Sequence, residues 1–339
     1  MLRKNKRVFI IAEISANHGQ NLDKAISLIR KAKECGADAV KFQTYTPDTL
    51  TINCRRKEFI IKHPEWGGQS LYDLYQQAYA PWGWFEKLKK VADEENIIFF
   101  STAFDETSVD FLESMNVPIH KIASFEIVDI PLIKYVCKTK KPLIISTGMA
   151  TLSEIREAVN VVRKEGVIGL ALLKCVSSYP ARPKEMNLRT IPAMKKKFDL
   201  PVGLSDHTMG VSVSIAAVAL GAEIIEKHFT LSRKAKTPDS FFSLEPQEFK
   251  ELVSNIRIAE DALGNECYGS TPDQRKSRKF RRSLYVVENV KKGELFTKEN
   301  VRSIRPSAGL PPKEFSKVIG KKSVKDIKKG TPLKYQYVV

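Results

Sequence analysis

Cysteine is scarce in this sequence, and the few cysteines form no recognisable pattern. The five residues Cys35, Cys54, Cys137, Cys175 and Cys267 are odd in number and scattered, and no two of them make a C-x-x-C pair. Spacing of this kind indicates neither a disulfide framework nor a zinc knuckle. We therefore expect the protein to work in a reducing compartment.

Long hydrophobic runs are also missing. The chain has no uninterrupted apolar stretch of about 18 residues and no charged-then-apolar leader at its N-terminus. We therefore expect a cytoplasmic protein with no membrane partner. With 339 residues, of which 42% are hydrophobic, the chain is long enough to bury one large core and to add a small module.

Acidic residues are scarce in one part of the chain only. From Gln274 to Val339 there are 19 Lys and Arg against 5 Asp and Glu, a balance of +14 out of the total charge of +17. A basic tail is typical of nucleic-acid-binding proteins, which is the rival function from a different class. The tail lacks the interleaved aromatic residues that stack on single strands, although Phe280 sits among the arginines. We expect no nucleic-acid partner.

Short β-branched runs alternate along the chain with longer segments of helical period. The predicted strands are Val8–Ile14, Ala39–Gln43, Ile97–Ser101, Ile119–Ile122, Pro142–Ser146, Leu170–Cys175, Val202–Ser205 and Ile224–His228. Predicted helices include Leu22–Cys35, Ser153–Arg163, Val211–Leu220 and Pro246–Leu263. Strict alternation of this kind predicts a parallel sheet covered by helices.

Eight such repeats predict an α/β fold of the closed (β/α)8 TIM-barrel type. The open doubly wound sheet is the alternative, but eight units exceed its usual six strands and no G-x-G-x-x-G follows the first strand. We expect the catalytic barrel over residues 1–263, a basic linker over 264–283 and a small, mostly-β module over 284–339. Residues 46–80 are predicted to form a long loop over the active face.

Nearly every predicted strand ends in polar or ionisable residues, and the carboxyl ends of barrel strands share one face. These residues are Glu13, Lys41, Gln43, Ser101, Thr102, Lys121, Ser124, Ser146, Thr147, Ser177, Ser178, Ser205, His207, Glu226 and His228. The sequence therefore predicts an active site at this face.

Two of the chain's five histidines, His207 and His228, end neighbouring predicted strands. Two imidazoles that leave coordination positions open suit a catalytic divalent ion better than a closed structural zinc site. A single histidine at a strand end is more often a hydrogen-bonded barrel residue, so this alternative remains open.

Lys41 and Lys121 also end strands, among serine and threonine hydroxyls that could serve as hydrogen-bond donors. Burying an unpaired lysine is costly, so the two lysines indicate either a bound anion or acidic partners. A phosphate or carboxylate ligand suits such a ring of donors. We expect an anionic substrate.

At this point the chain resembles the sialic acid synthase family over its whole length. The motifs that carry the resemblance, in the family's order, are IIAEISANH, VKFQTYTPDT, HKIASFE, ISTGMAT, KCVSSYP, GLSDHT and EKHFTL. In the tail, RRSLYVVENVKKGE and IRPSAGLPP are similar to the antifreeze-like (SAF) module of these enzymes. LYDLYQQAYAPWGWF, EMNLRTIP and TPDSFFSLEP resemble the pseudaminic acid synthases of the family more than the others, and Ser240 stands where sialic acid synthases usually have histidine.

The resemblance implies a transferase that condenses phosphoenolpyruvate with an aminosugar aldehyde and releases phosphate. The implied sugar is 2,4-diacetamido-2,4,6-trideoxy-β-L-altropyranose and the implied product is pseudaminic acid. The precursors of N-acetylneuraminic or legionaminic acid are the alternative substrates. It also implies a divalent metal ion, with Mn²⁺ expected and Mg²⁺ or Co²⁺ as alternatives, and a homodimer in which each C-terminal module covers the partner's barrel.

The resemblance further implies individual roles. His207 and His228 would hold the metal ion, and Glu13 would handle the proton of the attacking water. The positions around phosphoenolpyruvate are Lys41, Thr102, Lys121, Ser124, Ser146, Ser177 and Ser205; those on the sugar side are Gln43, Tyr179, Asp239 and Arg305. Ser15 and Thr237 depart from the family pattern, which commonly has glycine at both positions. At Thr237 the departure affects the flexibility of the loop before Pro238 and with it the placement of Asp239.

Overall fold

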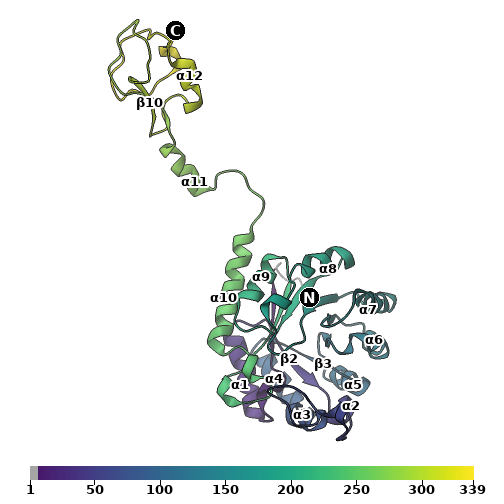
Figure 1. Ribbon diagram of the computed structural model, residues 1–339. Coiled ribbons are helices and arrows are strands. Elements are labelled where there is room, and N and C mark those ends of the chain that lie inside the picture. Colours follow the sequence, from purple (N-terminus) through teal and green to yellow (C-terminus); the bar gives the residue numbers. More distant parts are fainter. Residues whose placement is uncertain (1–6) are drawn as a thin grey trace. The chain divides into compact units, whose positions relative to one another are not determined.

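The computed structural model describes residues 7–339, which form strands and helices in alternation (Figure 1). The strands are β1 (Phe9–Glu13), β2 (Ala39–Thr44), β3 (Ile98–Ala103), β4 (His120–Ile122), β5 (Leu143–Ser146), β6 (Leu170–Cys175), β7 (Val202–Asp206), β8 (Ile224–His228), β9 (Ser283–Val286) and β10 (Val301–Ile304). The helices are α1 (Leu22–Glu34), α2 (Pro47–Leu50), α3 (Leu71–Ala78), α4 (Phe85–Glu94), α5 (Glu106–Ser114), α6 (Ile130–Cys137), α7 (Leu152–Lys164), α8 (Thr190–Phe198), α9 (Ser212–Ala219), α10 (Pro246–Leu263), α11 (Pro272–Ser277) and α12 (Phe315–Val318).

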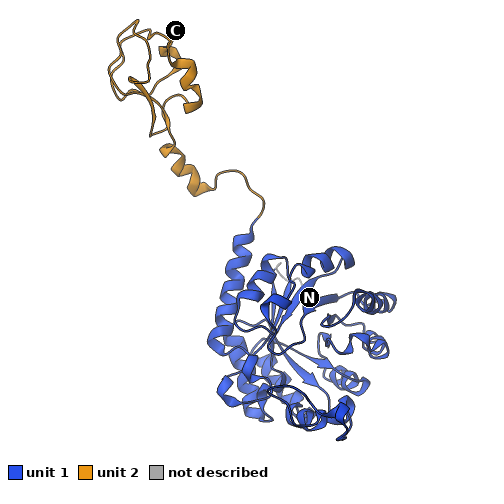
Figure 2. Ribbon diagram, in the orientation of Figure 1, with its two compact units in different colours: residues 1–264 blue, residues 265–339 orange. Residues whose placement is uncertain are grey.

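The chain folds into two compact units, Met1–Gly264 and Asn265–Val339 (Figure 2). In the first unit, β1 to β8 pair in sequence order and β8 closes onto β1, all in parallel. The predicted (β/α)8 barrel is therefore confirmed, and each predicted strand agrees with the observed one to within two residues. Closure excludes the open doubly wound sheet.

Helices surround the barrel, and α1 illustrates how an apolar face packs against the strands. Its residues Ala25, Leu28, Ile29 and Ala32 lie on one face and are fully buried. The helix begins after Asn21, whose side chain accepts a hydrogen bond from the backbone of Lys24 and caps the first turn. The apolar faces of α1 and its neighbours bury the outward side of the strands.

The inside of the barrel holds a second, smaller apolar cluster. It consists of Ile11, Ala39, Phe100, Ile119, Ile144, Ala171, Leu173 and Ile224, all completely buried. Because strand side chains alternate between the two faces, the inward-pointing residues two positions later form the next layer toward the carboxyl ends. This apolar layer is therefore the floor on which the candidate site stands.

Residues 46–80 were predicted as a loop, and this prediction was wrong for part of the segment, because α2 and α3 lie within it. The N-terminus of α3 is a capping box, in which the Ser70 side chain accepts from the Asp73 backbone and Asp73 accepts from that of Ser70. The S-x-x-D spacing before an apolar-periodic stretch was the sequence signal for this helix.

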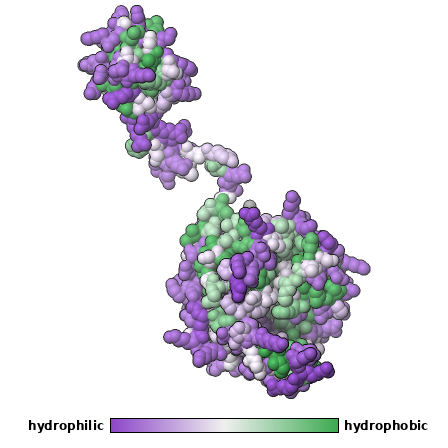
Figure 3. Space-filling model, in the orientation of Figure 1, coloured by the Kyte–Doolittle hydropathy of each residue, from purple (hydrophilic) through white to green (hydrophobic). Residues whose placement is uncertain are grey.

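The second unit has its own core around the antiparallel pair β9 and β10. Leu284, Val286, Phe296, Val301 and Leu333 are fully buried in it. Its visible surface is largely hydrophilic (Figure 3), consistent with the excess of lysine and arginine in this part of the sequence. Within the described residues, no helix has the length and apolar character needed to span a membrane.

Candidate active site

Polar side chains form the layer directly above the apolar floor of the barrel. Glu13, Lys41, Thr102, Lys121, Ser146, Ser205 and Glu226 each follow an inward-facing residue by two positions, and all are buried. We call these seven residues the polar layer. A cavity of about 60 Å³ at the carboxyl ends of the strands is lined by the polar layer together with Gln43, Ala123, Ser124, Phe125, Cys175, Tyr179, His207 and His228.

The structure thus brings together most of the residues that the sequence singled out. Ser177 lies at the edge of the cavity, with its Oγ 3.8 Å from Cys175 Sγ, and Asp239 Oδ2 lies 3.9 Å from His228 Nδ1. Arg305 is exposed and belongs to the second unit.

Lys41 is not an unpaired cation, because carboxylates compensate its charge. Its Nζ lies 2.6 Å from Glu13 Oε2 and 3.7 Å from Glu226 Oε2, and it donates to Thr102 Oγ1 at 3.0 Å. Of the two alternatives that the sequence left open, acidic partners are therefore present at Lys41. Burial raises the pKa of Glu13 to about 7, although the charge of Lys41 opposes the shift. A carboxyl group with this pKa can both take and give a proton near neutral pH.

Lys121 lies on the other side of the cavity and has a different environment. Its Nζ donates to Ser146 Oγ at 2.6 Å and to the carbonyl of Ile122 at 2.9 Å. Burial lowers the pKa of Lys121, against the opposing charge of Glu226. An anionic ligand at this place would offset the cost of burying the ammonium group.

The turn after β5 is packed closely against the hydroxyls beside Lys121. The backbone N–H of Gly148 donates to Ser124 Oγ at 3.0 Å. A Cβ atom on Gly148 would lie 2.3 Å from Ser177 Oγ and 2.7 Å from Ser124 Oγ, so only glycine fits here. This close approach gathers two serine hydroxyls and a backbone N–H at one edge of the cavity.

His207 and His228 lie side by side, with ring centroids 5.3 Å apart. Nδ1 of His207 lies 2.9 Å from the carbonyl of Val176, and donation to this acceptor leaves the lone pair on Nε2. Nδ1 of His228 is buried without a hydrogen-bond partner. Burial and the neighbouring His207 hold the pKa of His228 well below its ordinary value, so it is a neutral imidazole with a free lone pair.

These two side chains fit a divalent metal ion, since neutral imidazole nitrogens are the donors that such ions prefer. No cluster of three or more His, Cys, Asp or Glu side chains suited to a metal occurs within residues 7–339. A metal on this pair would therefore have open positions for water or substrate.

A buried ion pair lies behind the two histidines, on the outward face of β7 and β8. Lys227 Nζ is 2.8 Å from Asp206 Oδ2, and the two side chains are 1% and 0% exposed. Asp206 also accepts from Thr208 Oγ1 at 2.7 Å and from Ser214 Oγ at 2.6 Å. Burial opposes ionisation of Asp206, but the charge of Lys227 and these hydrogen bonds keep its pKa below the ordinary value. Asp206 and Lys227 directly precede the histidines in sequence, so the pair fixes the backbone that carries them.

Aromatic residues connect the segment 46–80 to the site. The ring centroid of Trp66 lies 5.7 Å from that of Tyr179, which in turn lies 4.5 Å from His207. Trp66 Nε1 donates to the carbonyl of Pro238 at 2.7 Å. The segment therefore reaches the active face, as the sequence predicted, and contacts the loop that carries Asp239.

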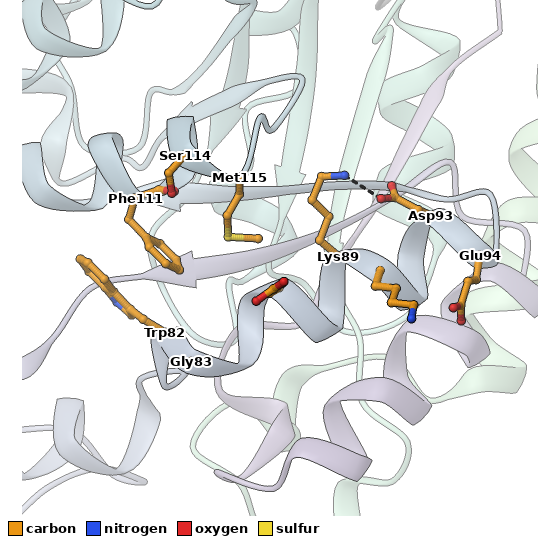
Figure 4. A pocket seen from close by; sticks show the side chains of 10 residues that line it. Trp82, Gly83, Lys89, Asp93, Glu94, Phe111, Ser114 and Met115 are labelled. Atoms are coloured by element: carbon orange, nitrogen blue, oxygen red, sulfur yellow. Dashed lines mark hydrogen bonds and ion pairs between the residues drawn. The ribbon is translucent and has the colours of Figure 1, made fainter.

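A larger groove of about 720 Å³ lies elsewhere on the barrel, between α4 and α5 (Figure 4). Its side chains include Trp82, Phe111 and Met115 with a rim of mixed charge, and Lys89 pairs there with Asp93. It has neither the histidine pair nor the buried lysines. The chemistry therefore assigns the active site to the smaller cavity.

The sequence placed Glu226 at the active face without assigning it a role, and it did not single out Cys175; both line the cavity. Glu226 accepts from Ser205 Oγ at 3.0 Å, and Cys175 Sγ lies 3.8 Å from His207 Nδ1. Cys175 follows the inward-facing Leu173 by two residues on the same strand, so period-two alternation was the signal that could have identified it.

Comparison with known proteins agrees with this arrangement. The model of the NeuB family matches residues 28–268, and that of the SAF domain matches residues 281–339. A pseudaminic acid synthase from Campylobacter jejuni is 46% identical over 330 residues, covering 97% of this chain and 96% of the relative. A pseudaminic acid synthase from Helicobacter pylori is 42% identical and covers 96% of both chains.

Among solved structures, an N-acetylneuraminic acid (sialic acid) synthetase from Leptospira borgpetersenii superposes with a TM-score of 0.72 at 35% identity. The match covers 80% of this chain and 90% of that one. The barrel and the second unit thus have counterparts in one group of enzymes. The chain belongs to the NeuB family and carries a SAF domain.

Proposed function

We propose that this enzyme condenses phosphoenolpyruvate with 2,4-diacetamido-2,4,6-trideoxy-β-L-altropyranose to give pseudaminic acid and phosphate. The observation that carries the proposal is the cavity itself, in which the two lysines and two carboxylates of the polar layer converge with a histidine pair. The similarity to pseudaminic acid synthases over nearly the whole chain supports this sugar in particular.

Phosphoenolpyruvate would bind on the side of Lys121. The ammonium group and the hydroxyls of Ser124, Ser146 and Ser177 supply charge-assisted hydrogen bonds to phosphate and carboxylate oxygens. Lys41 with Thr102 and Ser205 would complete this set from the opposite wall. Burial strengthens each of these interactions because the local dielectric constant is low.

In the reaction, C3 of phosphoenolpyruvate forms a bond to the aldehyde carbon of the open sugar, whose oxygen takes up a proton. Water then adds to C2 and loses a proton, and the C2–O bond to phosphate breaks. Glu13 is suited to accept that proton because its pKa is about 7, and Gln43 donates to its Oε1 at 3.0 Å and holds it in place. Tyr179 and Asp239 are proposed to contact the sugar.

His207 and His228 would hold a divalent ion, which we propose to be Mn²⁺. When bound, such an ion supplies Lewis acidity toward the aldehyde oxygen. The chain's own contribution is to keep the imidazole of His228 neutral through burial, and to fix the ring of His207 through its hydrogen bond to the carbonyl of Val176.

The test is to incubate the protein with phosphoenolpyruvate, Mn²⁺ and each candidate aminosugar, and to identify the product by mass while phosphate release is measured. The proposal expects turnover with the altropyranose. Turnover only with the precursor of N-acetylneuraminic or legionaminic acid would establish that alternative, and no phosphate release with any sugar would refute both.

We further propose a homodimer in which the SAF domain of each chain covers the barrel of its partner and Arg305 completes the partner's sugar site. Exposed apolar side chains near the ends of the strands support a covering partner: Phe125 and Val128 follow β4, and Met149 and Leu152 follow β5. Residues 264–283, which the sequence predicted as a linker, include α11, so this segment spans less than a fully extended chain would.

A mixing experiment tests the exchange. Glu13→Ala and Arg305→Ala chains, each inactive alone, should regain activity as mixed dimers if Arg305 acts on the partner's barrel, because one site then has both native residues. No recovery on mixing, with the formation of mixed dimers verified, would mean that Arg305 acts within its own chain.

We also propose that the enzyme is cytoplasmic. The free thiols of Cys35, Cys137 and Cys175, all buried in the barrel, are consistent with a reducing compartment. Cell fractionation tests this proposal, and detection of the chain in the membrane or secreted fraction would contradict it.

A further inference from the structure

Ser15 stands in a backbone conformation that serine rarely adopts. Its φ is 45°, in the left-handed region, where glycine is the favoured residue because it has no Cβ. The residue is only 5% exposed and begins the short turn Ser15–His18 after β1. A strained serine in a buried turn persists only where its side chain contributes something that glycine lacks.

The hydroxyl of Ser15 connects the ends of three elements. It accepts from Gln43 Nε2 at 2.9 Å and donates to Asp239 Oδ2 in the loop after β8. The same amide nitrogen of Gln43 donates to Glu13 Oε1 at 3.0 Å. A continuous chain of hydrogen bonds therefore runs from Glu13 through Gln43 and Ser15 to Asp239.

The direction of these hydrogen bonds is fixed by chemistry. The amide of Gln43 must present its nitrogen to the carboxylate of Glu13, so its second N–H is the donor to Ser15. The hydroxyl hydrogen of Ser15 is then free for Asp239. Both hydrogen bonds form only if the side chain at this position accepts one and donates the other, and the methyl group of alanine can do neither.

As a result, only one carboxylate oxygen of Asp239 takes part in these hydrogen bonds. Its Oδ2 accepts from Ser15 and, at 3.3 Å, from the backbone N–H of Ala16. Both hydrogen bonds that this carboxylate accepts from residues 7–339 fall on Oδ2, so Oδ1 is the oxygen available to a hydroxyl or amide N–H of a ligand.

We propose that Ser15 is a positioning residue that orients Asp239 toward the acetamido sugar and ties it to the Glu13–Gln43 pair. The inference rests on the proposed function, because it takes the sugar to be the ligand of Asp239. It adds a residue that touches neither substrate but determines how the sugar binds.

A second contact between the same loops provides a control. Thr237 Oγ1 donates to Asn17 Oδ1 at 2.7 Å, which also joins the loop after β8 to the turn after β1. Thr237→Ala removes this contact but leaves the hydrogen bonds of Asp239 in place. If the loops needed only to be held together, Thr237→Ala and Ser15→Gly would have the same effect.

The experiment compares Ser15→Gly, Ser15→Ala and Thr237→Ala with the wild type by steady-state kinetics and thermal unfolding. Ser15→Gly relieves the backbone strain, so we expect its melting temperature to equal or exceed that of the wild type. We expect its KM for the sugar to rise roughly tenfold or more, because a buried carboxylate has lost a hydrogen bond, while the KM for phosphoenolpyruvate changes less than about twofold. Ser15→Ala should show the same split in KM with a lower melting temperature.

Two outcomes overturn the inference. One is an unchanged KM for the sugar in Ser15→Gly. The other is that the KM values for the sugar and for phosphoenolpyruvate rise equally, and do so in both Ser15→Gly and Thr237→Ala. If the wild type itself forms no product from the altropyranose, the proposed function fails instead, so the two failures are distinguishable.

Discussion

The ion pair behind His207 and His228 gives the most demanding test of the structural reasoning. Lys227 and Asp206 are 2.8 Å apart and their side chains are 1% and 0% exposed. Replacing Lys227 with Met removes the ammonium group but keeps a side chain of similar length and volume. Asp206 then stays buried with neutral donors alone, chiefly Thr208 and Ser214.

Breaking a buried pair on one side costs about 3–5 kcal/mol, because the remaining charge has no compensating partner. In a domain of this size each kcal/mol lowers the melting temperature by about 2–4 °C, so we expect Lys227→Met to lower it by roughly 10 °C. The chain's three tryptophans, Trp66, Trp82 and Trp84, all lie in the barrel unit. Tryptophan fluorescence therefore follows barrel unfolding separately from the SAF unit, which avoids treating two units as one transition.

The double variant Asp206→Asn with Lys227→Met is the matched control. The asparagine oxygen, in the place of Oδ1, still accepts from Thr208, its amide nitrogen, in the place of Oδ2, can donate to Ser214 Oγ, and no unpaired charge remains. We expect the double variant to be more stable than either single variant. The reasoning is refuted if Lys227→Met costs less than about 1 kcal/mol, or if the two single effects simply add.

Three further predictions follow from the site and its surroundings. Burial and the charge of Lys24 lower the pKa of His18 from 6.5 to about 4. As the pH falls, the unfolded state therefore binds a proton before the folded state does. We expect the free energy of unfolding to decrease between pH 6.5 and 4, by up to about 3 kcal/mol. Equilibrium unfolding at several pH values should show this loss in the wild type relative to His18→Gln; parallel curves for the two proteins would contradict it. Glu13→Gln should lower turnover roughly a hundredfold or more while phosphoenolpyruvate binding, measured by calorimetry, is nearly unchanged; a change in KM alone would make Glu13 a binding residue. His207→Ala or His228→Ala should abolish both activity and Mn²⁺ binding measured by electron paramagnetic resonance, and full turnover after exhaustive chelation would exclude the metal.

The barrel could be predicted because its signals are local and repeated. Each strand is a short β-branched run bounded by turn residues, and α1 and α10 carry an apolar face at helical spacing. Parallel strands place their carboxyl ends at one face, so residues far apart in sequence, such as Glu13 and His228, could be assigned to one site before the structure was known.

The parts that could not be predicted depend on contacts between side chains that are far apart in sequence, which the hydrophobic periodicity does not indicate. Nothing in the sequence around Lys41 indicates that Glu13 and Glu226 compensate its charge, because the three residues meet only through barrel closure. The hydrogen bond from Ser15 to Asp239 joins two loops that are far apart in sequence, and a serine side chain by itself gives no indication of the positive φ of Ser15. Helix α3 could have been predicted, because the capping box of Ser70 and Asp73 is visible in the sequence, but the length of the segment 46–80 favoured a loop.

The polar layer also explains why this barrel tolerates so many buried ionisable groups. Glu13 and Glu226 face Lys41 and Lys121 across the cavity, so two potential negative charges balance two positive ones before any ligand binds. When an anion binds, a carboxyl group with a pKa of about 7 can take up a proton, whereas one with an ordinary pKa would remain charged. The raised pKa thus lets one residue neutralise the empty site and later serve as the acid or base, and the apolar floor beneath it provides the burial that raises the pKa.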